Sequence, residues 1–171
     1  MTTTPVTATG SAQTYRNFMR GFPTGVAVVT ALDGRRQPVG FTCSSLSGLS
    51  LEPPMLLVCI SNVSTTLAQI RVGGIFAVNL LSQRGRSAAD QFSAPGHDRF
   101  AGTAWRPTAT LALPWLVEAA HAVSECRVVR MVEAGDHTIV VGSVEAVTTV
   151  DDDPTPLLHC FGRYKVWPKS A

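Results

Sequence analysis

Residues Phe22–Thr66 have the sequence FPTGVAVVTALDGRRQPVGFTCSSLSGLSLEPPMLLVCISNVSTT, in which apolar runs alternate with small hydroxyl side chains. Val26–Leu32 and Gln37–Thr42 are rich in strand-forming residues, and Asp33-Gly34 between them is a strong hairpin signal. The continuous apolar run Met55–Ile60 predicts a strand that is buried on both faces. This part of the chain therefore predicts strands whose ends carry Ser and Thr.

The rest of the chain predicts more strands and only short helices. Helical spacing of apolar residues, with Ser or Thr at some starts, predicts helices at Tyr15–Phe22, Ser64–Val72 and Ser82–Phe92. Further strands are expected at Ile75–Leu81, Ala122–Val132, Thr138–Val150 and Leu157–Phe161. Ser93–Val117 lacks periodicity and is expected to cross the surface as an irregular segment. Because strands and helices do not alternate regularly, we predict a mainly β protein built on a closed or nearly closed β-barrel.

Composition favours one globular domain. With 171 residues, we expect a flexible N-terminal tail at 1–13 and a single domain at 14–171. Hydrophobic residues make up 45% and charged residues 15% of the chain, so we expect another subunit to cover part of the apolar surface. The net charge of +2 comes from scattered residues, which argues against a nucleic-acid-binding surface.

The chain also lacks signals for membranes and metals. No apolar run approaches membrane-spanning length and the start does not resemble a secretory signal, so we expect a cytoplasmic protein without a membrane segment. The four cysteines and four histidines have no zinc-site spacing, and we expect no metal. Reduced, structural thiols are the default interpretation, and Cys43 is the thiol that could line a site.

Two hydroxyl-rich clusters are the candidate binding residues. The first, at the end of a predicted strand, suits hydrogen bonds to the polar edge of a flat ring and comprises Thr42, Cys43, Ser44, Ser45 and Ser50. The second lies between the end of a predicted strand and the start of a predicted helix, where it could bind a phosphate. It comprises Ser61, Asn62, Ser64, Thr65 and Thr66. The local alternatives are a Ser/Thr turn for the first cluster and an ordinary N-cap by Ser64 or Asn62 for the second.

Several motifs, in this order, make the chain resemble the short-chain flavin reductase family, the reductase halves of two-component flavin monooxygenases. They are Phe22-Pro-Thr-Gly25, Gly40-Phe-Thr-Cys-Ser-Ser45, Asp98-Arg99-Phe100, Gly135-Asp136-His137 and Phe161-Gly-Arg-Tyr164. The resemblance covers Tyr15–Val166. It implies a homodimer with a Greek-key split β-barrel of the FMN-binding type and a few flanking short helices.

The same resemblance implies roles for single residues. His137 would approach the nicotinamide as the catalytic residue, although a solvated histidine in a hairpin is the local alternative. Arg99 would meet the flavin phosphate or adenine, where a surface salt bridge with Asp98 is the alternative. The nicotinamide side would be lined by Phe22, Pro23, Thr24, Phe161, Gly162, Arg163 and Tyr164.

The activity implied is hydride transfer from NADH to FAD or FMN, with free reduced flavin diffusing to a partner monooxygenase. No Rossmann fingerprint is present, and no Arg cluster near Gly135–His137 offers a site for a 2′-phosphate, so we favour NADH over NADPH. One alternative is a non-catalytic flavin-binding or dimer-scaffold protein on the same barrel. A pyridoxamine-phosphate-oxidase-like enzyme is disfavoured, because the predicted phosphate site is poor in Arg and Lys.

Overall fold

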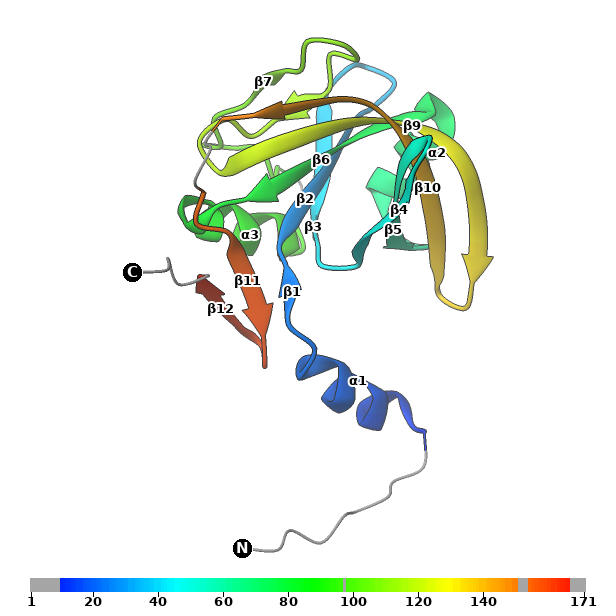
Figure 1. The fold of residues 1–171 in the computed structure, drawn as a ribbon, viewed down its shortest axis with the longest axis vertical. Coiled ribbons are helices and arrows are strands. Elements are labelled where there is room, and N and C mark those ends of the chain that lie inside the picture. The colour runs from blue at the N-terminus through cyan, green and yellow to red at the C-terminus, as the bar shows by residue number, and fades with distance from the viewer. Residues whose placement is uncertain (1–9, 97, 151–153, 167–171) are drawn as a thin grey trace, which may run out of the picture.

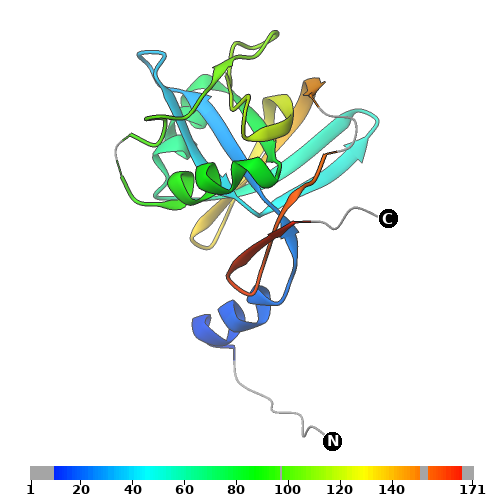
Figure 2. The same cartoon turned by 90° about the vertical axis from the view of Figure 1, so that its left-hand side faces the viewer.

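The computed structural model describes residues 10–96, 98–150 and 154–166, and its main feature is one curled antiparallel sheet of seven strands (Figures 1 and 2). Along the sheet the order is β3-β2-β6-β9-β10-β5-β4. The strands are β2 (Ala27–Leu32), β3 (Pro38–Cys43), β4 (Leu46–Leu51), β5 (Pro54–Ser61), β6 (Ile75–Leu81), β9 (Ala120–Ala134) and β10 (His137–Thr149). The predicted mainly β class is confirmed.

Short elements surround this sheet. Figure 1 shows α1 lying away from the barrel, beyond a small sheet of order β1-β11-β12. The remaining elements are α1 (Ala12–Arg20), β1 (Thr24–Gly25), α2 (Thr65–Gly73), the 3₁₀ helix η1 (Gln83–Gly85), α3 (Arg86–Ser93), β7 (Arg106–Pro107), β8 (Pro114–Trp115), β11 (Leu157–Cys160) and β12 (Arg163–Val166). None of the helices in the described ranges is long and apolar enough to cross a membrane.

The termini of two predicted elements differ from the structure. Ser11 caps α1 by accepting a hydrogen bond from the Thr14 amide, so Ala12 and Gln13 of the predicted tail are helical. Residues 1–9 of that tail lie outside the described residues. The prediction that the last strand includes Phe161 is wrong, because Phe161 and Gly162 both have positive φ and turn the chain from β11 into β12.

Strand β4 is absent from the sequence-based prediction, which placed Ser50 in a hydroxyl-rich binding cluster, with a Ser/Thr turn as the alternative. Leu46–Leu51 instead pairs antiparallel with β5 at the edge of the sheet, with a register shift between Gly48 and Ser50. Ser and Gly obscure the apolar alternation that marks a strand, and an edge position tolerates them. Ser50 therefore belongs to an edge strand.

The core lies on both faces of β2, because successive side chains of a strand point to opposite sides. Val28 belongs to a cluster with Phe92 of α3 and Leu116. Its neighbour Val29 belongs to a second cluster with Leu67 of α2. Helices α2 and α3 thus cover opposite faces of the sheet, which brings the start of α2 and the loop after α3 close to β3.

In its described residues, the segment predicted to be irregular has the short pair β7 and β8 as its strands, and it is fixed by buried polar side chains. Glu125 of β9 is fully buried and accepts hydrogen bonds from the Thr108 hydroxyl at 2.7 Å and from the amides of Thr110 and Leu111. Buried Asn79 of β6 accepts one from the Leu116 amide at 2.9 Å. These bonds replace the strand ladder that the segment lacks.

Gly142 is required by close packing. It lies at a register shift between β9 and β10, and a Cβ added there would stand 2.7 Å from Cζ of the fully buried Phe76. We predict that Gly142→Ala lowers the free energy of unfolding by about 1–3 kcal/mol, because a well-packed core must shift to admit the methyl group. Urea denaturation followed by tryptophan fluorescence measures this change.

Gly48→Ala is the matched control for this substitution. Gly48 is also a strand glycine, but no atom lies within 4 Å of its added Cβ, and we expect a change within about 0.5 kcal/mol. Equal stabilities for the two variants would contradict the packing argument.

Candidate functional site

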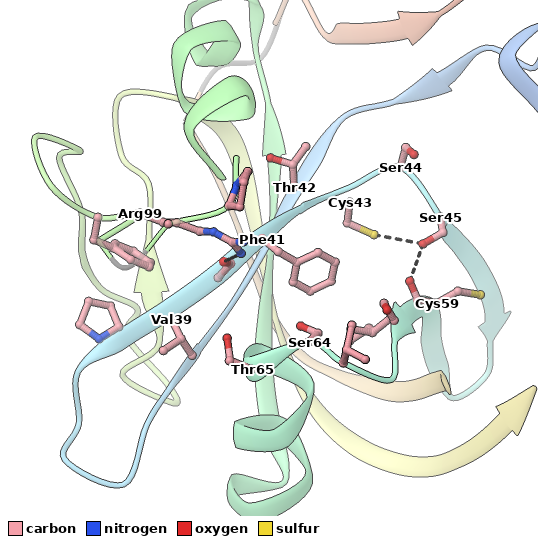
Figure 3. Close-up of a pocket in the computed structure, with 18 of the residues that line it drawn as sticks. Val39, Phe41, Thr42, Cys43, Ser44, Ser45, Cys59, Ser64, Thr65 and Arg99 are labelled. Atoms are coloured by element: carbon pink, nitrogen blue, oxygen red, sulfur yellow. Dashed lines mark hydrogen bonds between the residues drawn. The ribbon is translucent and has the colours of Figure 1, made fainter. Parts of the chain in front are cut away.

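A cavity of about 740 Å³ lies between β3 and the junction of β5 with α2 (Figure 3). The loop that follows α3 forms its third side, through Pro95, Gly96 and Asp98–Phe100. Of the predicted site residues, nine line this cavity: Thr42, Cys43, Ser44, Ser45, Ser61, Ser64, Thr65, Arg99 and His137. The structure thus brings both hydroxyl-rich clusters to one cavity.

Ser45, between β3 and β4, is hydrogen-bonded to β5 at one end of the cavity. Its hydroxyl donates to the Cys59 carbonyl at 2.8 Å, and its own carbonyl accepts from the Cys59 amide at 3.4 Å (Figure 3). The Thr42 hydroxyl donates to the Ala89 carbonyl of α3 at 2.7 Å. Thr42 and Ser45 therefore use their hydroxyls within the protein, whereas Ser44 is exposed between the strands.

Cys43 contributes a neutral thiol to the cavity wall. Its side chain is buried, and its sulfur lies 3.4 Å from the Ser45 hydroxyl. Burial raises the pKa of this thiol, and the hydrogen bond with Ser45 only partly opposes that shift. All four cysteines are free, as expected. In the described ranges, no group of three or more His, Cys, Asp or Glu residues could hold a metal ion.

The first turn of α2 has both features that were predicted for the second hydroxyl-rich cluster, an N-cap and free amides suited to a phosphate. Ser64 is the N-cap and accepts a hydrogen bond from the Leu67 amide at 3.4 Å. The amides of Thr65 and Thr66 still have no acceptor within the helix, because a helix begins here. The positive end of the helix dipole therefore faces the cavity beside Ser64 and exposed Thr65, an arrangement suited to a phosphate.

Arg99 extends from the loop after α3 toward β3. Its Nη1 donates to the Gly40 carbonyl at 2.9 Å and its Nε to the Ala94 carbonyl at 3.2 Å. Among the ion pairs of the described residues there is none between Arg99 and Asp98, whose carboxylate accepts from the Phe100 amide instead. The alternative of a surface salt bridge is wrong, and the guanidinium presents a positive charge to the cavity.

His137 lies at the opposite rim, as the first residue of β10. It pairs in register with Ser61 of β5, and its side chain is 46% exposed. Nδ1 lies 2.7 Å from the Asp136 carboxylate, and this hydrogen bond, followed by the charge of the imidazole, lowers the pKa of Asp136. The carboxylate therefore fixes the ring by Nδ1 and leaves Nε2 outside this hydrogen bond.

Three further residues of the predicted clusters do not line the cavity. Ser50 lies in the edge strand β4, and Thr66 is buried in the first turn of α2. Asn62 follows β5 but turns toward the tip of the β9–β10 hairpin, where its side chain donates to the Gly135 carbonyl at 3.3 Å. The structure places Asn62 in a hairpin contact and not in the cavity wall.

The residues predicted for the nicotinamide side gather at a second place in the single chain. Thr24 pairs with His159 in the small sheet, and the Phe161 amide donates to the Arg20 carbonyl at 2.6 Å. This brings the two motifs close to each other but outside the cavity wall. The group comprises Phe22, Pro23, Thr24, Phe161, Gly162, Arg163 and Tyr164.

Apolar wall residues are the part of the site that the sequence analysis missed. Val39, Phe41 and Phe100 line the cavity together with Val63, which is 92% exposed. Phe41 and Phe100 belong to the quoted motifs, so those motifs contained the signal. An isolated Val63 among Asn, Ser and Thr is a second, weaker signal of an apolar rim.

Sequence and structure comparisons agree with this site. The family described as flavin reductase like domain matches residues 19–168. A flavin reductase (NADPH) of Lentzea aerocolonigenes is 45% identical over 157 residues, 92% of this chain and 91% of that protein. The reductase subunit HsaB of a flavin-dependent monooxygenase of Mycobacterium tuberculosis is 37% identical over 153 residues, 89% of this chain and 80% of that protein.

A solved structure extends the likeness to the fold. The NADH:FAD oxidoreductase SgcE6 of Streptomyces globisporus C-1027, in complex with NAD and FAD fragments, matches with a TM-score of 0.90 at 28% identity. The match covers 98% of this chain and 99% of that chain. The resemblance predicted from the motifs is confirmed, and the chain belongs to the flavin reductase like domain family.

Proposed function

We propose that the protein is an NAD(P)H:flavin oxidoreductase that reduces FAD or FMN and supplies free reduced flavin to a partner monooxygenase. The observation that carries this proposal is the cavity between β3 and the start of α2, which unites neutral donors, a phosphate-compatible helix start and His137. Relatives named as flavin reductases and as a monooxygenase reductase subunit support the same activity. A cytoplasmic location stays a prediction.

The residues of the cavity fit a flavin. Its volume of about 740 Å³ lies within the usual range for cofactor sites, and Val39 and Phe41 supply apolar wall against which a flat ring packs. The first turn of α2 and the Arg99 guanidinium suit the phosphate end. When bound, the flavin supplies the hydride-accepting ring, so the protein needs no acid or base for that step.

The protein's part is to bind and orient. Ser44 lies outside the strands and is exposed, so we assign its backbone amide as a donor toward the polar edge of the ring. The Asp136 carboxylate holds the His137 ring through Nδ1, and Nε2 is then directed to the nicotinamide carboxamide. Because the donors are mostly neutral, we expect a flavin affinity low enough for release after reduction.

We further propose NADH as the preferred reductant. Arg71 contacts the hairpin bearing His137, and its guanidinium already donates to Glu133 at 2.9 Å and to Thr138 at 3.0 Å. The Arg71 guanidinium therefore binds the hairpin and is not available to bind the 2′-phosphate of NADPH. Relatives are named for both nicotinamides, so direct comparison of the two is the deciding measurement.

The first prediction of this function is catalytic turnover with added flavin. Purified protein should oxidise NADH, followed at 340 nm, only when free FAD or FMN is present, with a turnover of roughly 1–1000 per second. The kcat/KM for NADPH should be lower than that for NADH. A protein that retains yellow flavin through purification, without NADH oxidation when flavin is added, would instead be the non-catalytic flavin-binding scaffold.

His137 provides the second prediction. His137→Ala should reduce kcat/KM for NADH about tenfold, because one hydrogen bond to the carboxamide is lost, while the dissociation constant of flavin changes less than about twofold. His121→Gln in β9, outside the cavity wall, is the control and should leave both constants unchanged. Unaltered NADH kinetics in His137→Ala would remove His137 from the site.

We also propose a homodimer, because α1 lies away from the barrel (Figure 1), has no buried residue and exposes its large apolar side chains. Tyr15, Phe18 and Phe22 are each more than 60% exposed, and Met19 lies on the same face. Phe161 packs near Gly21 at the end of this helix and is also exposed. A second copy of the chain is the occupant that we assign to this face, since large exposed apolar patches mark protein interfaces.

Replacing one aromatic residue of α1 tests this dimer. The wild-type protein should have twice the monomer mass by light scattering, and Phe18→Asp should shift it to monomer at micromolar concentration, because a buried unpaired carboxylate is costly. Asn17→Asp adds the same charge one residue away, off the apolar face, and should remain dimeric. A monomeric wild-type protein would be inconsistent with the assignment.

A further inference from the structure

The tip of the β9–β10 hairpin carries His137 but has few contacts within the sheet. The ladder between β9 and β6 ends at the pair of Arg127 with Ile75, so beyond it β9 pairs only with β10. On its other side β10 pairs with β5 as far as Ser61, the last residue of that strand. Strand pairing alone therefore leaves residues 133–136, next to His137, as an exposed hairpin end, which is prone to local opening.

Asn62 fastens this end by three hydrogen bonds. Its amide donates to the Asp136 carbonyl at 2.9 Å and its Nδ2 to the Gly135 carbonyl at 3.3 Å. Its Oδ1 accepts from the Thr138 hydroxyl at 2.7 Å. One residue at the end of β5 thus contacts every residue from Gly135 to Thr138 except His137 itself, and leaves the imidazole to face the cavity.

Helix α2 fastens the same hairpin from a second side. Arg71 in its last turn donates from Nη2 to the Thr138 hydroxyl at 3.0 Å and to the Glu133 carboxylate at 2.9 Å. The Arg71–Glu133 pair is largely exposed and adds little, whereas Thr138 is fully buried and both accepts and donates a hydrogen bond there. Thr138 is therefore the centre of this network.

The network joins the two halves of the cavity. The first turn of α2 borders the cavity at Ser64 and Thr65, and the last turn of the same helix reaches Thr138 beside His137. A helix of nine residues is a rigid spacer of about 13 Å. Helix α2 therefore fixes the position of His137 relative to Ser64 and Thr65, the residues assigned to the flavin phosphate.

We propose that Asn62 and Thr138 are positioning residues that hold His137 against the flavin cavity and so set the orientation of the nicotinamide. The inference rests on the proposed function and assigns Asn62 a role other than phosphate binding. It requires that loss of the network weakens nicotinamide use while flavin binding stays intact, because a small displacement of an orienting group costs reaction rate.

Thr138→Val tests this role, with Thr108→Val as the matched control. Each threonine is buried, and each hydroxyl donates one hydrogen bond and accepts another. Thr138→Val should lower kcat/KM for NADH about tenfold, mainly through KM, and leave the KM for flavin within about twofold. Thr108→Val should lose stability but keep both constants.

Amide hydrogen exchange provides a readout that is independent of turnover. The Asn62 amide is bonded to the Asp136 carbonyl, so its exchange reports whether the hairpin end is held. Exchange at Asn62 should accelerate about tenfold or more in Thr138→Val and stay unchanged in Thr108→Val. Unchanged exchange and unchanged NADH kinetics in Thr138→Val would overturn the proposal.

Asn62→Ala keeps the test decisive if Thr138→Val does not fold, because Asn62 is exposed and its replacement spares the core. It should reproduce the tenfold loss with NADH. A rise in the KM for flavin with normal NADH kinetics would identify Asn62 as a phosphate ligand and overturn the proposal.

If the wild-type protein shows no turnover, the proposed function fails, and exchange at the Gly135–Thr138 amides in Asn62→Ala still decides the positioning role.

Discussion

The two hydrogen bonds between Ser45 and Cys59 are the constraint on which the cavity depends. The chain leaves β3 at one edge of the seven-stranded sheet, and these bonds hold it close to β5 near the other edge. From that corner β3 and the β5–α2 junction run along opposite sides of the cavity (Figure 3). The cavity is thus a gap between two strands that are joined at one end, and backbone groups outside the strand ladders gather beside it.

Polar side chains hold the irregular segment after α3 in place. Glu125 and Asn79 fix the segment after α3 to the sheet, and Gln91 of α3 donates to the carbonyls of Arg99 and Ala101 at 2.9 and 2.8 Å. Each of these side chains satisfies backbone groups that no strand ladder reaches. The long loop is irregular in its dihedral angles but well anchored, and it is Gln91 that holds the part carrying Arg99 beside the cavity.

Local signals explain which parts of the fold were predictable. The hairpin at Asp33-Gly34, the strand at Met55–Ile60 and the stop of α2 at Gly74, which adopts a left-handed conformation, all follow from short-range preferences. The predicted burial of that strand on both faces is wrong, because only Val58 and Ile60 are buried and the residues between and before them are partly exposed near the edge of the sheet. Strand β4 was missed because an edge strand needs little apolar alternation. The positive φ of Phe161 was missed because non-glycine residues rarely adopt it, and the contact with Arg20 that accompanies it comes from 141 positions earlier in the chain.

The same distinction applies to the site. The motifs identified the two hydroxyl clusters, but composition could not show that Thr42 and Ser45 use their hydroxyls on the protein's own carbonyls. Nor could it show that Asn62 turns toward the hairpin, since its partners lie more than 70 residues away. Spacing along a strand predicts which residues share a region, whereas hydrogen-bond partners are set by tertiary packing.

The chemistry of the cavity wall agrees with a protein that orients reactants and takes no part in the electron transfer itself. Cys43 and Cys59 both line the cavity, and burial raises the pKa of the Cys43 thiol. Cys126, in the adjoining core, has a pKa raised by burial to about 11. Both thiols are protonated at neutral pH, and the thiolate is the form that attacks disulfides and oxidants. Electrons delivered at this cavity therefore meet no thiolate at Cys43, and the rest of the first hydroxyl-rich cluster in the wall consists of hydroxyls, which bind without reacting.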